Sequence, residues 1–291
     1  MSIYLRLLRI HQWLKNGFIV FPLIFSGLFV QKEKSIDVVL VLFAFCCIAS
    51  SIYIINDIFD FKRDQKHPQK KDRPIAAGLI APQSALLFSI VLMIAGLYLG
   101  FLVDVNSGYL MVAYVTLHLI YNFYAKNIVI LDVFFIAFGF QLRIWIGSVV
   151  VGVLPSAWLQ MCVFVLSLFL GFTKRRHEIS ILKEKAAEHR QALLEYNVYL
   201  LDQIIVICST LTIVFYGLYS ISEDILKRLG NTHMIYSLAF VVFGIFRYLY
   251  LVHVKKQGGE PGEVILHDKA SIINLIFWFA FIMTLLGLSI I

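Results

Sequence analysis

Long apolar runs separated by short polar connections recur along the whole 291-residue chain. A helix needs roughly 20 mostly apolar residues to cross the hydrocarbon core of a bilayer. The runs are too uniformly apolar for barrel strands, and an open sheet cannot satisfy its backbone in lipid. We therefore expect an all-α, polytopic membrane bundle of about nine spans, near residues 17–31, 38–56, 84–102, 109–124, 129–151, 157–173, 200–221, 235–253 and 270–290.

The composition supports a membrane protein. The chain is 60% hydrophobic and 15% charged, whereas a soluble domain carries about a quarter charged residues. We expect one integral-membrane domain over residues 1–291 and no cleavable signal peptide. The cysteines lie within apolar runs and form no CxxC pair, so we interpret them as buried apolar residues: Cys46, Cys47, Cys162 and Cys208.

The basic residues predict an orientation. Most of the 25 Lys and Arg residues fall on connections that share one side of the membrane with the N-terminal segment. Because cytoplasmic connections carry an excess of Lys and Arg, this asymmetry predicts an N-in, C-out topology. It also explains the net charge of +7 without a nucleic-acid partner. Few basic residues would face the other side: Lys32, Lys34, Lys227 and Arg228.

The second run ends in an acidic segment, "SSIYIINDIFDFKRD". If the helix continues through it, Asp57, Asp60 and Asp64 share one face, and Asn56 lies one turn before Asp60. Clustered carboxylates repel one another unless a cation neutralises them. Mg²⁺ does so with carboxylate, amide and phosphate oxygens, so we expect Asn56, Asp60 and Asp64 to bind it. The simpler alternative is a solvated helix end whose acids pair with nearby Lys and Arg.

"NDIFDFKRD" fits the NDxxDxxxD signature of the UbiA superfamily of intramembrane prenyltransferases, and "DRPIAAG" resembles the element that follows it. The resemblance covers the whole chain. It implies a helical bundle around a central cavity, capped on the cytoplasmic side by segments 57–82 and 174–198. It also implies that Asp57, Asp60 and Asp64 are catalytic and hold Mg²⁺ on a diphosphate.

The second charged segment, "GFTKRRHEISILKEKAAEHRQALLEYN", departs from the prenyltransferase pattern, which has a second aspartate cluster after the sixth helix. Only Glu178 stands near the expected place, and it follows Lys174, Arg175, Arg176 and His177. Arg and Lys pair directly with phosphate oxygens. A cationic segment here therefore indicates a substrate with more phosphate than one diphosphate.

Four elements resemble the decaprenyl-phosphate phosphoribosyltransferase branch of this superfamily: "HQWLKN", "HPQKKDRPIAAG", "YNFYAKNIVILDVFFIAFGFQLRIWIG", and "KRRHEI" followed by "RQALLEY". The resemblance implies an Mg²⁺-dependent pentosyltransferase. Its donor would be phosphoribosyl pyrophosphate, and its acceptor a polyprenyl phosphate whose tail lies in the membrane. It also implies a bacterial inner-membrane protein with its active site facing the cytoplasm, and it leaves a homo-oligomer open.

Further polar residues are candidate substrate contacts, although each also fits a topology-setting charge or an interface residue: Gln12, Lys15, Lys70, Arg73, Lys126, Lys174, Arg175, Glu178 and Tyr196. Asp132 suits a substrate contact or the positive N-terminus of a helix. Arg143, deep in a span, suits a functional role or a structural pair. His118 lies in an apolar span, and we expect it to be a satisfied packing residue.

Two alternatives remain open. One is an aromatic or quinone prenyltransferase that uses a prenyl diphosphate, against which the missing second aspartate cluster argues. The other is a transporter of anionic solutes, because polar residues in a polytopic bundle often mark a pathway. Transporters commonly contain inverted repeats, and the acidic segment has no convincing repeat in this sequence.

Overall fold

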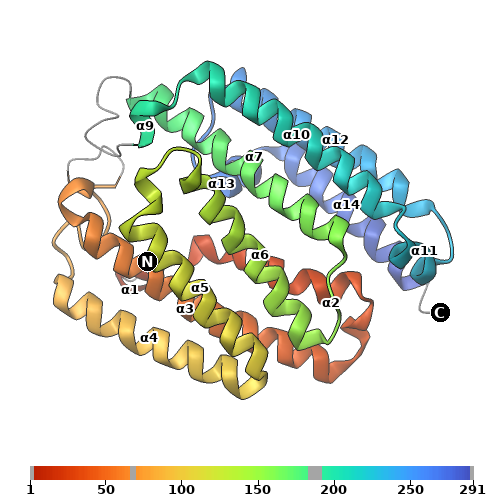
Figure 1. Cartoon of the computed structure of the whole chain (residues 1–291), viewed down its shortest axis with the longest axis horizontal. Coiled ribbons are helices and arrows are strands. Elements are labelled where there is room, and N and C mark those ends of the chain that lie inside the picture. The colour runs from red at the N-terminus through yellow and green to blue at the C-terminus, as the bar shows by residue number, and fades with distance from the viewer. Residues whose placement is uncertain (1–2, 66–69, 183–191, 289–291) are drawn as a thin grey trace. The chain divides into compact units, whose positions relative to one another are not determined.

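The computed structural model describes residues 3–65, 70–182 and 192–288. Within these residues the regular secondary structure is helical, as predicted (Figure 1). Among the described residues, seven helices are long and apolar enough to cross a membrane by length and composition. Each of them overlaps one of the nine predicted spans, and the count of nine stays a prediction.

The chain folds into two compact units, each with its own buried apolar cluster. Met1–Lys126 and Leu142–Leu154 form the first unit, and Asn127–Gln141 and Pro155–Ile291 form the second. The predicted single-domain organisation is not tested by this division and stays a prediction.

The first unit is built around one unusually long helix, α3. Its 33 residues correspond to about 50 Å at 1.5 Å per residue, well beyond the roughly 30 Å hydrocarbon core. The described elements of this unit are α1 (Ile3–Leu8), η1 (Ile10–Val20), α2 (Phe21–Phe25), η2 (Leu28–Val30), α3 (Lys32–Asp64), α4 (Pro82–Val103), α5 (Val105–Phe123), η3 (Ala125–Asn127) and the second part of α6 (Leu131–Val151).

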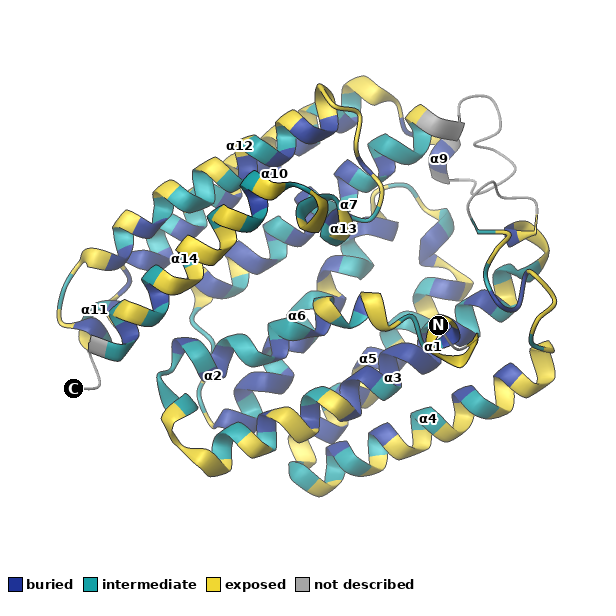
Figure 2. Cartoon of the chain, turned by 180° about the vertical axis from the view of Figure 1, so that it is seen from behind, coloured by how far each residue is buried: buried dark blue, intermediate teal, exposed yellow. Residues whose placement is uncertain are grey.

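Small residues let helices approach closely in the first unit. A Cβ on Gly96 of α4 would lie 2.6 Å from the carbonyl oxygen of Ala44 on α3, and a Cβ on Gly147 of α6 would lie 2.0 Å from that of Ile19 on η1. Close backbone contact at small residues is how helices gain packing energy in lipid. The most apolar part of α3 is mostly buried, whereas α4 exposes much of its surface (Figure 2).

The predicted span 17–31 is not one continuous helix. It is divided among the end of η1, α2 and η2. Pro22 lies at the start of α2, and Gly27 has a φ of 71° before η2, a left-handed conformation that breaks a helix. The predicted span 109–124 does form a helix, α5, although it is not among the seven candidate spans.

In the described residues, the second unit contains the first part of α6, seven further α-helices and one 3-10 helix. Its core joins Val133 of α6 to Phe169, Leu201 and Tyr248 of three other helices. The described elements are α7 (Ala157–Leu182), α9 (Ala192–Glu195), α10 (Val198–Ser220), α11 (Glu223–Leu229), η5 (His233–Ser237), α12 (Leu238–His253), α13 (Pro261–His267) and α14 (Lys269–Leu288).

Candidate active site

Three aspartates lie on the last turns of α3. The helix runs without a break to Asp64, so Asp57, Asp60 and Asp64 share one face. The predicted continuation of the helix through this segment is therefore confirmed. Asp57 and Asp64 are buried, whereas the side chain of Asp60 is 19% exposed. Carboxylates this close disfavour one another's charge unless cations compensate them, and other segments of the first unit supply those cations.

The guanidinium of Arg73 lies between two of these carboxylates. Its Nη1 donates to Asp57 Oδ1 at 2.9 Å and to Asp64 Oδ2 at 2.5 Å. The side chain is 23% exposed, and it projects from a turn in which the Arg73 N–H donates to the carbonyl of the predicted substrate residue Lys70. Arg73 thus takes the position that a cation shared by Asp57 and Asp64 would occupy.

Two further basic residues complete the charge balance. Lys126 of η3 is buried, and its Nζ donates to Asp60 Oδ1 at 2.9 Å. Arg9 pairs with Asp57, and its guanidinium lies 5.4 Å from the ring centroid of Tyr53. Arg9 has a φ of 53° between α1 and η1, which is uncommon for a residue other than glycine. No local sequence pattern around Arg9 predicts this pairing.

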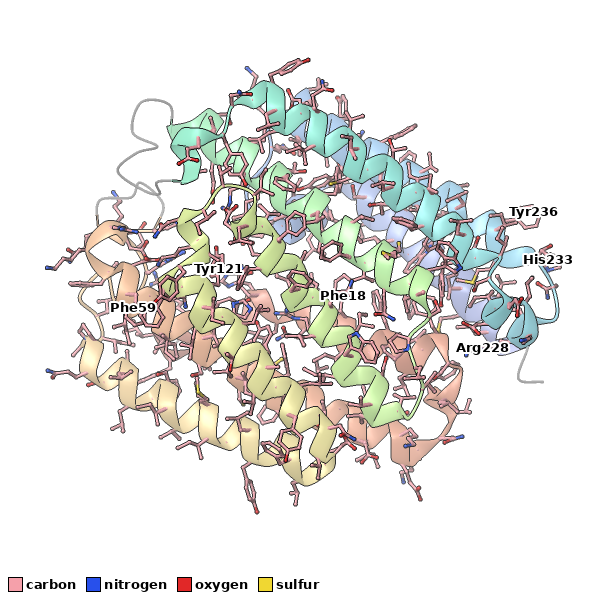
Figure 3. All side chains as sticks on the ribbon, in the orientation of Figure 1. Phe18, Phe59, Tyr121, Arg228, His233 and Tyr236 are labelled. Carbon is pink, nitrogen blue, oxygen red and sulfur yellow. The ribbon has the colours of Figure 1, made fainter. Side chains whose placement is uncertain are left out.

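Aromatic contacts bring the end of α5 beside the acidic end of α3. The rings of Phe59 and Phe123 meet edge to face, with centroids 5.1 Å apart. Figure 3 labels Phe59 and, on α5, Tyr121. Lys126 follows Phe123 by three residues, so this contact places its ammonium group within reach of Asp60.

The chemistry of this acidic end fits a hard divalent cation, because Asn56, Asp60 and Asp64 offer amide and carboxylate oxygens. Across the described part of the chain, however, no three His, Cys, Asp or Glu side chains are arranged to hold a metal ion. The carboxylates face basic side chains instead. A cation shared by Asp57 and Asp64 would therefore require Arg73 to move away, and the metal-binding roles stay predictions.

Two more predicted residues of this unit lie on η1. Gln12 is buried and Lys15 is half-buried. η1 is fixed against α3 by a hydrogen bond from Trp13 Nε1 to Ser50 Oγ at 3.0 Å. Substrate contact by Gln12 and Lys15 remains a prediction.

The second unit has its own charged cluster at the end of α7. Arg175 is 3% exposed; its Nε donates to Asp132 Oδ2 and its Nη1 to Glu178 Oε2, both at 2.6 Å. The Tyr196 hydroxyl donates to Asp132 Oδ1 at 2.9 Å. Burial, together with the adjacent Asp132 carboxylate, raises the pKa of Tyr196. The phenol therefore stays protonated and keeps donating to Asp132.

Tyr196 also fixes a strained stretch of backbone. Its hydroxyl accepts a hydrogen bond from the Ile130 N–H at 2.6 Å, and Ile130 has a φ of 69°. A left-handed conformation at a β-branched residue costs about 1–3 kcal/mol and persists only where its surroundings impose it. The cluster of Asp132, Arg175 and Tyr196 provides those surroundings.

Neighbouring cations of α7 are paired as well. Lys174 pairs with Glu260, just before α13. Arg176 pairs with Asp202 of α10, which also lies 3.2 Å from His253 Nε2. These acidic partners were not predicted, because they are distant in the sequence. The expected substrate contacts of Lys174, Arg175, Glu178 and Tyr196 stay predictions, and in this structure all four side chains have intramolecular partners.

The two predicted cap segments are described in part. Within 57–82, α3 continues to Asp64, and residues 66–69 lie outside the described residues. Within 174–198, α7 continues to Leu182, and residues 183–191 lie outside the described residues. The described parts therefore place the charged residues largely on helix ends.

Comparison with known proteins decides the family. Residues 19–180, more than half of the chain, match the UbiA prenyltransferase family. This chain belongs to that family. The matched region contains the acidic end of α3, Arg73, Lys126 and Arg175, and it ends before Tyr196. The predicted membership in the UbiA superfamily is confirmed.

Particular relatives refine the family assignment. The decaprenyl-phosphate phosphoribosyltransferase from Mycolicibacterium smegmatis is 29% identical to this UbiA-family chain, over 94% of this chain and 89% of the relative. The decaprenyl-phosphate phosphoribosyltransferase from Corynebacterium glutamicum is 30% identical, over 94% of this chain and 83% of the relative. A solved UbiA homologue from Archaeoglobus fulgidus bound to DMAPP and Mg²⁺ matches with a TM-score of 0.72, 16% identity and 99% coverage of both chains. The latter likeness shows the shared fold.

Proposed function

We propose that this UbiA-family protein transfers the 5-phosphoribosyl group from phosphoribosyl pyrophosphate to a polyprenyl phosphate and releases pyrophosphate. The observation that carries the proposal is the near-complete alignment with decaprenyl-phosphate phosphoribosyltransferases at 30% identity. The site adds support, because one cluster of carboxylates and basic residues offers partners both for a metal ion and for phosphate oxygens.

The donor's diphosphate would bind at the acidic end of α3. Asn56, Asp60 and Asp64, together with Asp57, would hold Mg²⁺, which would shield the charge of the diphosphate. The support is the single helix face that these residues share and the greater exposure of Asp60.

The basic residues around this end would exchange partners when the donor binds. Arg73 compensates Asp57 and Asp64, and Lys126 compensates Asp60. Once a cation takes over that compensation, both side chains are available to the diphosphate oxygens. Arg73 comes from an irregular segment, so it can move without disturbing a helix. Lys70 and Lys15 are further candidates for diphosphate contact.

The reaction itself needs little proton transfer. An oxygen of the lipid phosphate attacks C1 of the ribose, the bond from C1 to the diphosphate oxygen breaks, and the electron pair leaves with pyrophosphate. Because the acceptor is already ionised near neutral pH, no strong general base is required. The protein contributes orientation of two anionic substrates and stabilisation of the leaving group.

In the second unit, Lys174, Arg175, Glu178 and Tyr196 would act on the substrate or would hold the backbone of their own unit. The contacts of Arg175 and Tyr196 support the second role, because both side chains hold the segment around Ile130, which follows Lys126 by four residues.

We also propose that the N-terminus and the acidic end of α3 face the cytoplasm of a bacterium, with the protein in its inner membrane. The distribution of Lys and Arg supports this orientation. Phosphoribosyl pyrophosphate is a polyanion that would reach the site from the aqueous side, while the acceptor tail stays in the bilayer. One integral-membrane domain would carry the whole site.

The test uses the purified protein in detergent with decaprenyl phosphate, Mg²⁺ and phosphoribosyl pyrophosphate labelled in its ribose. We expect label in the extracted lipid, and none when EDTA replaces Mg²⁺. No labelling with any polyprenyl phosphate, combined with prenylation of an aromatic acid by a prenyl diphosphate, would instead support the aromatic prenyltransferase alternative.

A further inference from the structure

A row of polar side chains extends from the acidic end into the apolar interior of the first unit. Tyr114, His118 and Asn122 recur every four residues on α5 and therefore share one face. Lys126, the partner of Asp60, follows at the same spacing in η3. From Tyr114 to Asn122 the row covers about 12 Å along the helix axis.

The inner end of this row meets a buried cation. Arg143 of α6 is 4% exposed. Its Nε donates to Asn16 Oδ1 at 3.1 Å and its Nη2 to the Tyr114 hydroxyl at 3.0 Å, and its guanidinium lies 5.0 Å from the centroid of the Phe45 ring. An ionisable side chain buried in a membrane bundle is costly, and its default interpretation is a functional site.

Two nitrogen atoms in the row have no hydrogen-bond partner among the described residues. They are His118 Nε2 and Asn122 Nδ2, both buried, and Asn122 as a whole is 6% exposed. Buried polar atoms without a partner are rare in native proteins and indicate a ligand or a bound water. The expectation that His118 is a satisfied packing residue is therefore wrong for its Nε2 atom.

We infer that this row is a subsite for the phosphomonoester group of a substrate. Arg143 would neutralise the phosphate, Asn122 Nδ2 would donate to it, and His118 would donate from Nε2 in the tautomer protonated there. A phosphomonoester carries between one and two negative charges and several strong acceptor oxygens, which match a cation and two spare donors.

This inference rests on the proposed function, in which both substrates carry such a group. The group is the 5-phosphate in phosphoribosyl pyrophosphate and the head group in the polyprenyl phosphate. The row begins beside Lys126 and Asp60, so either phosphate would lie on the inner side of the diphosphate. Kinetics separate the two sources.

The experiment measures KM for each substrate in Asn122→Leu and His118→Phe, with the other substrate at saturation. Loss of a hydrogen bond to a charged group predicts a rise of about tenfold or more in one of the two KM values. Asn122→Asp should raise the same KM further, because its carboxylate repels phosphate. Thr116→Val is the matched control: Thr116 lies on the exposed face of α5 and bonds only along its own helix, to the Val112 carbonyl, so both KM values should stay unchanged.

A rise confined to the KM for phosphoribosyl pyrophosphate assigns the row to the 5-phosphate, and a rise confined to the KM for decaprenyl phosphate assigns it to the lipid head group. Unchanged values for both substrates in folded, active Asn122→Leu and His118→Phe proteins overturn the inference and leave the row filled by water.

A wild-type protein that transfers no ribose contradicts the proposed function instead. In that case the subsite is judged by inorganic phosphate, which should raise the melting temperature of the wild type more than that of Asn122→Leu. Equal shifts in the two proteins also overturn the inference. Arg143→Lys provides a check that keeps the charge: it should retain most of the phosphate-dependent shift if it folds.

Discussion

The two charged clusters of the molecule use the same kinds of residue in opposite arrangements. In the first unit the acids are fixed on one long helix, α3, and their basic partners come from the turn between α1 and η1, from η3 and from an irregular segment. In the second unit the cations are fixed on α7, and their acidic partners, apart from Glu178 of α7 itself, come from other elements.

The Arg175–Asp132 pair is more deeply buried than the ion pairs of the first unit, each of which has one partly exposed member. Arg175 and Asp132 are almost completely buried, at 3% and 0% exposure of their side chains, whereas Arg73 is 23% exposed and Asp60 is 19% exposed. Separating a fully buried ion pair leaves a charge without solvation. The pair in the second unit is therefore suited to holding structure, and the pairs in the first unit are suited to exchanging partners with a ligand.

The largest effect should come from Arg175→Met, because it leaves the Asp132 carboxylate buried without its guanidinium partner. We expect a loss of about 3–5 kcal/mol in the free energy of unfolding, measured by denaturant unfolding in detergent. Adding Asp132→Asn should recover part of this loss. The control Lys227→Ala removes a largely exposed pair with Glu223 and should unfold like the wild type. Wild-type stability of Arg175→Met would show that the pair does not hold the second unit together.

Asp60→Asn should lower kcat by on the order of 100-fold or more, since it removes a charged oxygen ligand from the proposed metal site. Circular dichroism and gel filtration should remain those of the wild type. Asp37→Asn, a change of the same kind near the opposite end of α3, is the matched control and should keep full activity. Equal activity in the two variants would remove the acidic end of α3 from the mechanism.

Arg73→Gln tests whether the first cluster can exchange partners. Without the guanidinium between Asp57 and Asp64, the donor-free protein should bind a divalent cation about tenfold more tightly, a gain of ~1.4 kcal/mol. Its KM for phosphoribosyl pyrophosphate should rise instead. The affinity for the divalent cation is measured with Mn²⁺ by electron paramagnetic resonance. Weaker Mn²⁺ binding would mean that Arg73 supports the metal site and does not compete with it.

Tyr196→Phe should have the smallest effect, a loss of about 1 kcal/mol in stability. The change removes the bonds to Asp132 and to the Ile130 N–H. Adding Ile130→Gly should restore part of the melting temperature, because glycine adopts a φ of 69° without steric cost. If Ile130→Gly lowers the melting temperature further, Tyr196 does not act by holding this backbone conformation.

The sequence predicted most of the helices, because a span long enough to cross a bilayer leaves a clear apolar run. It failed at residues 17–31, where hydropathy outweighed two local signals of a break, Pro22 and Gly27. The common face of Asp57, Asp60 and Asp64 was also predictable, since helical spacing is a local property.

The partners of these charges were less predictable. Lys126 stands alone in a short connection between two apolar runs of the sequence, and the structure brings it to Asp60. Arg9 lies 48 residues from Asp57, and Arg175 lies 43 residues from Asp132. Pairs at such separations depend on tertiary packing, and one sequence contains no spacing rule that reveals them.

The unbroken course of α3 ties the orientation of the carboxylates to the register of the buried segment before them. Inserting one alanine between Ile48 and Asp57 would rotate everything after it by about 100°. All three carboxylates would then turn together away from Arg9, Arg73 and Lys126, although no charged residue had been altered. In this protein the packing of the buried part of α3 therefore determines the direction in which the acidic end presents its carboxylates.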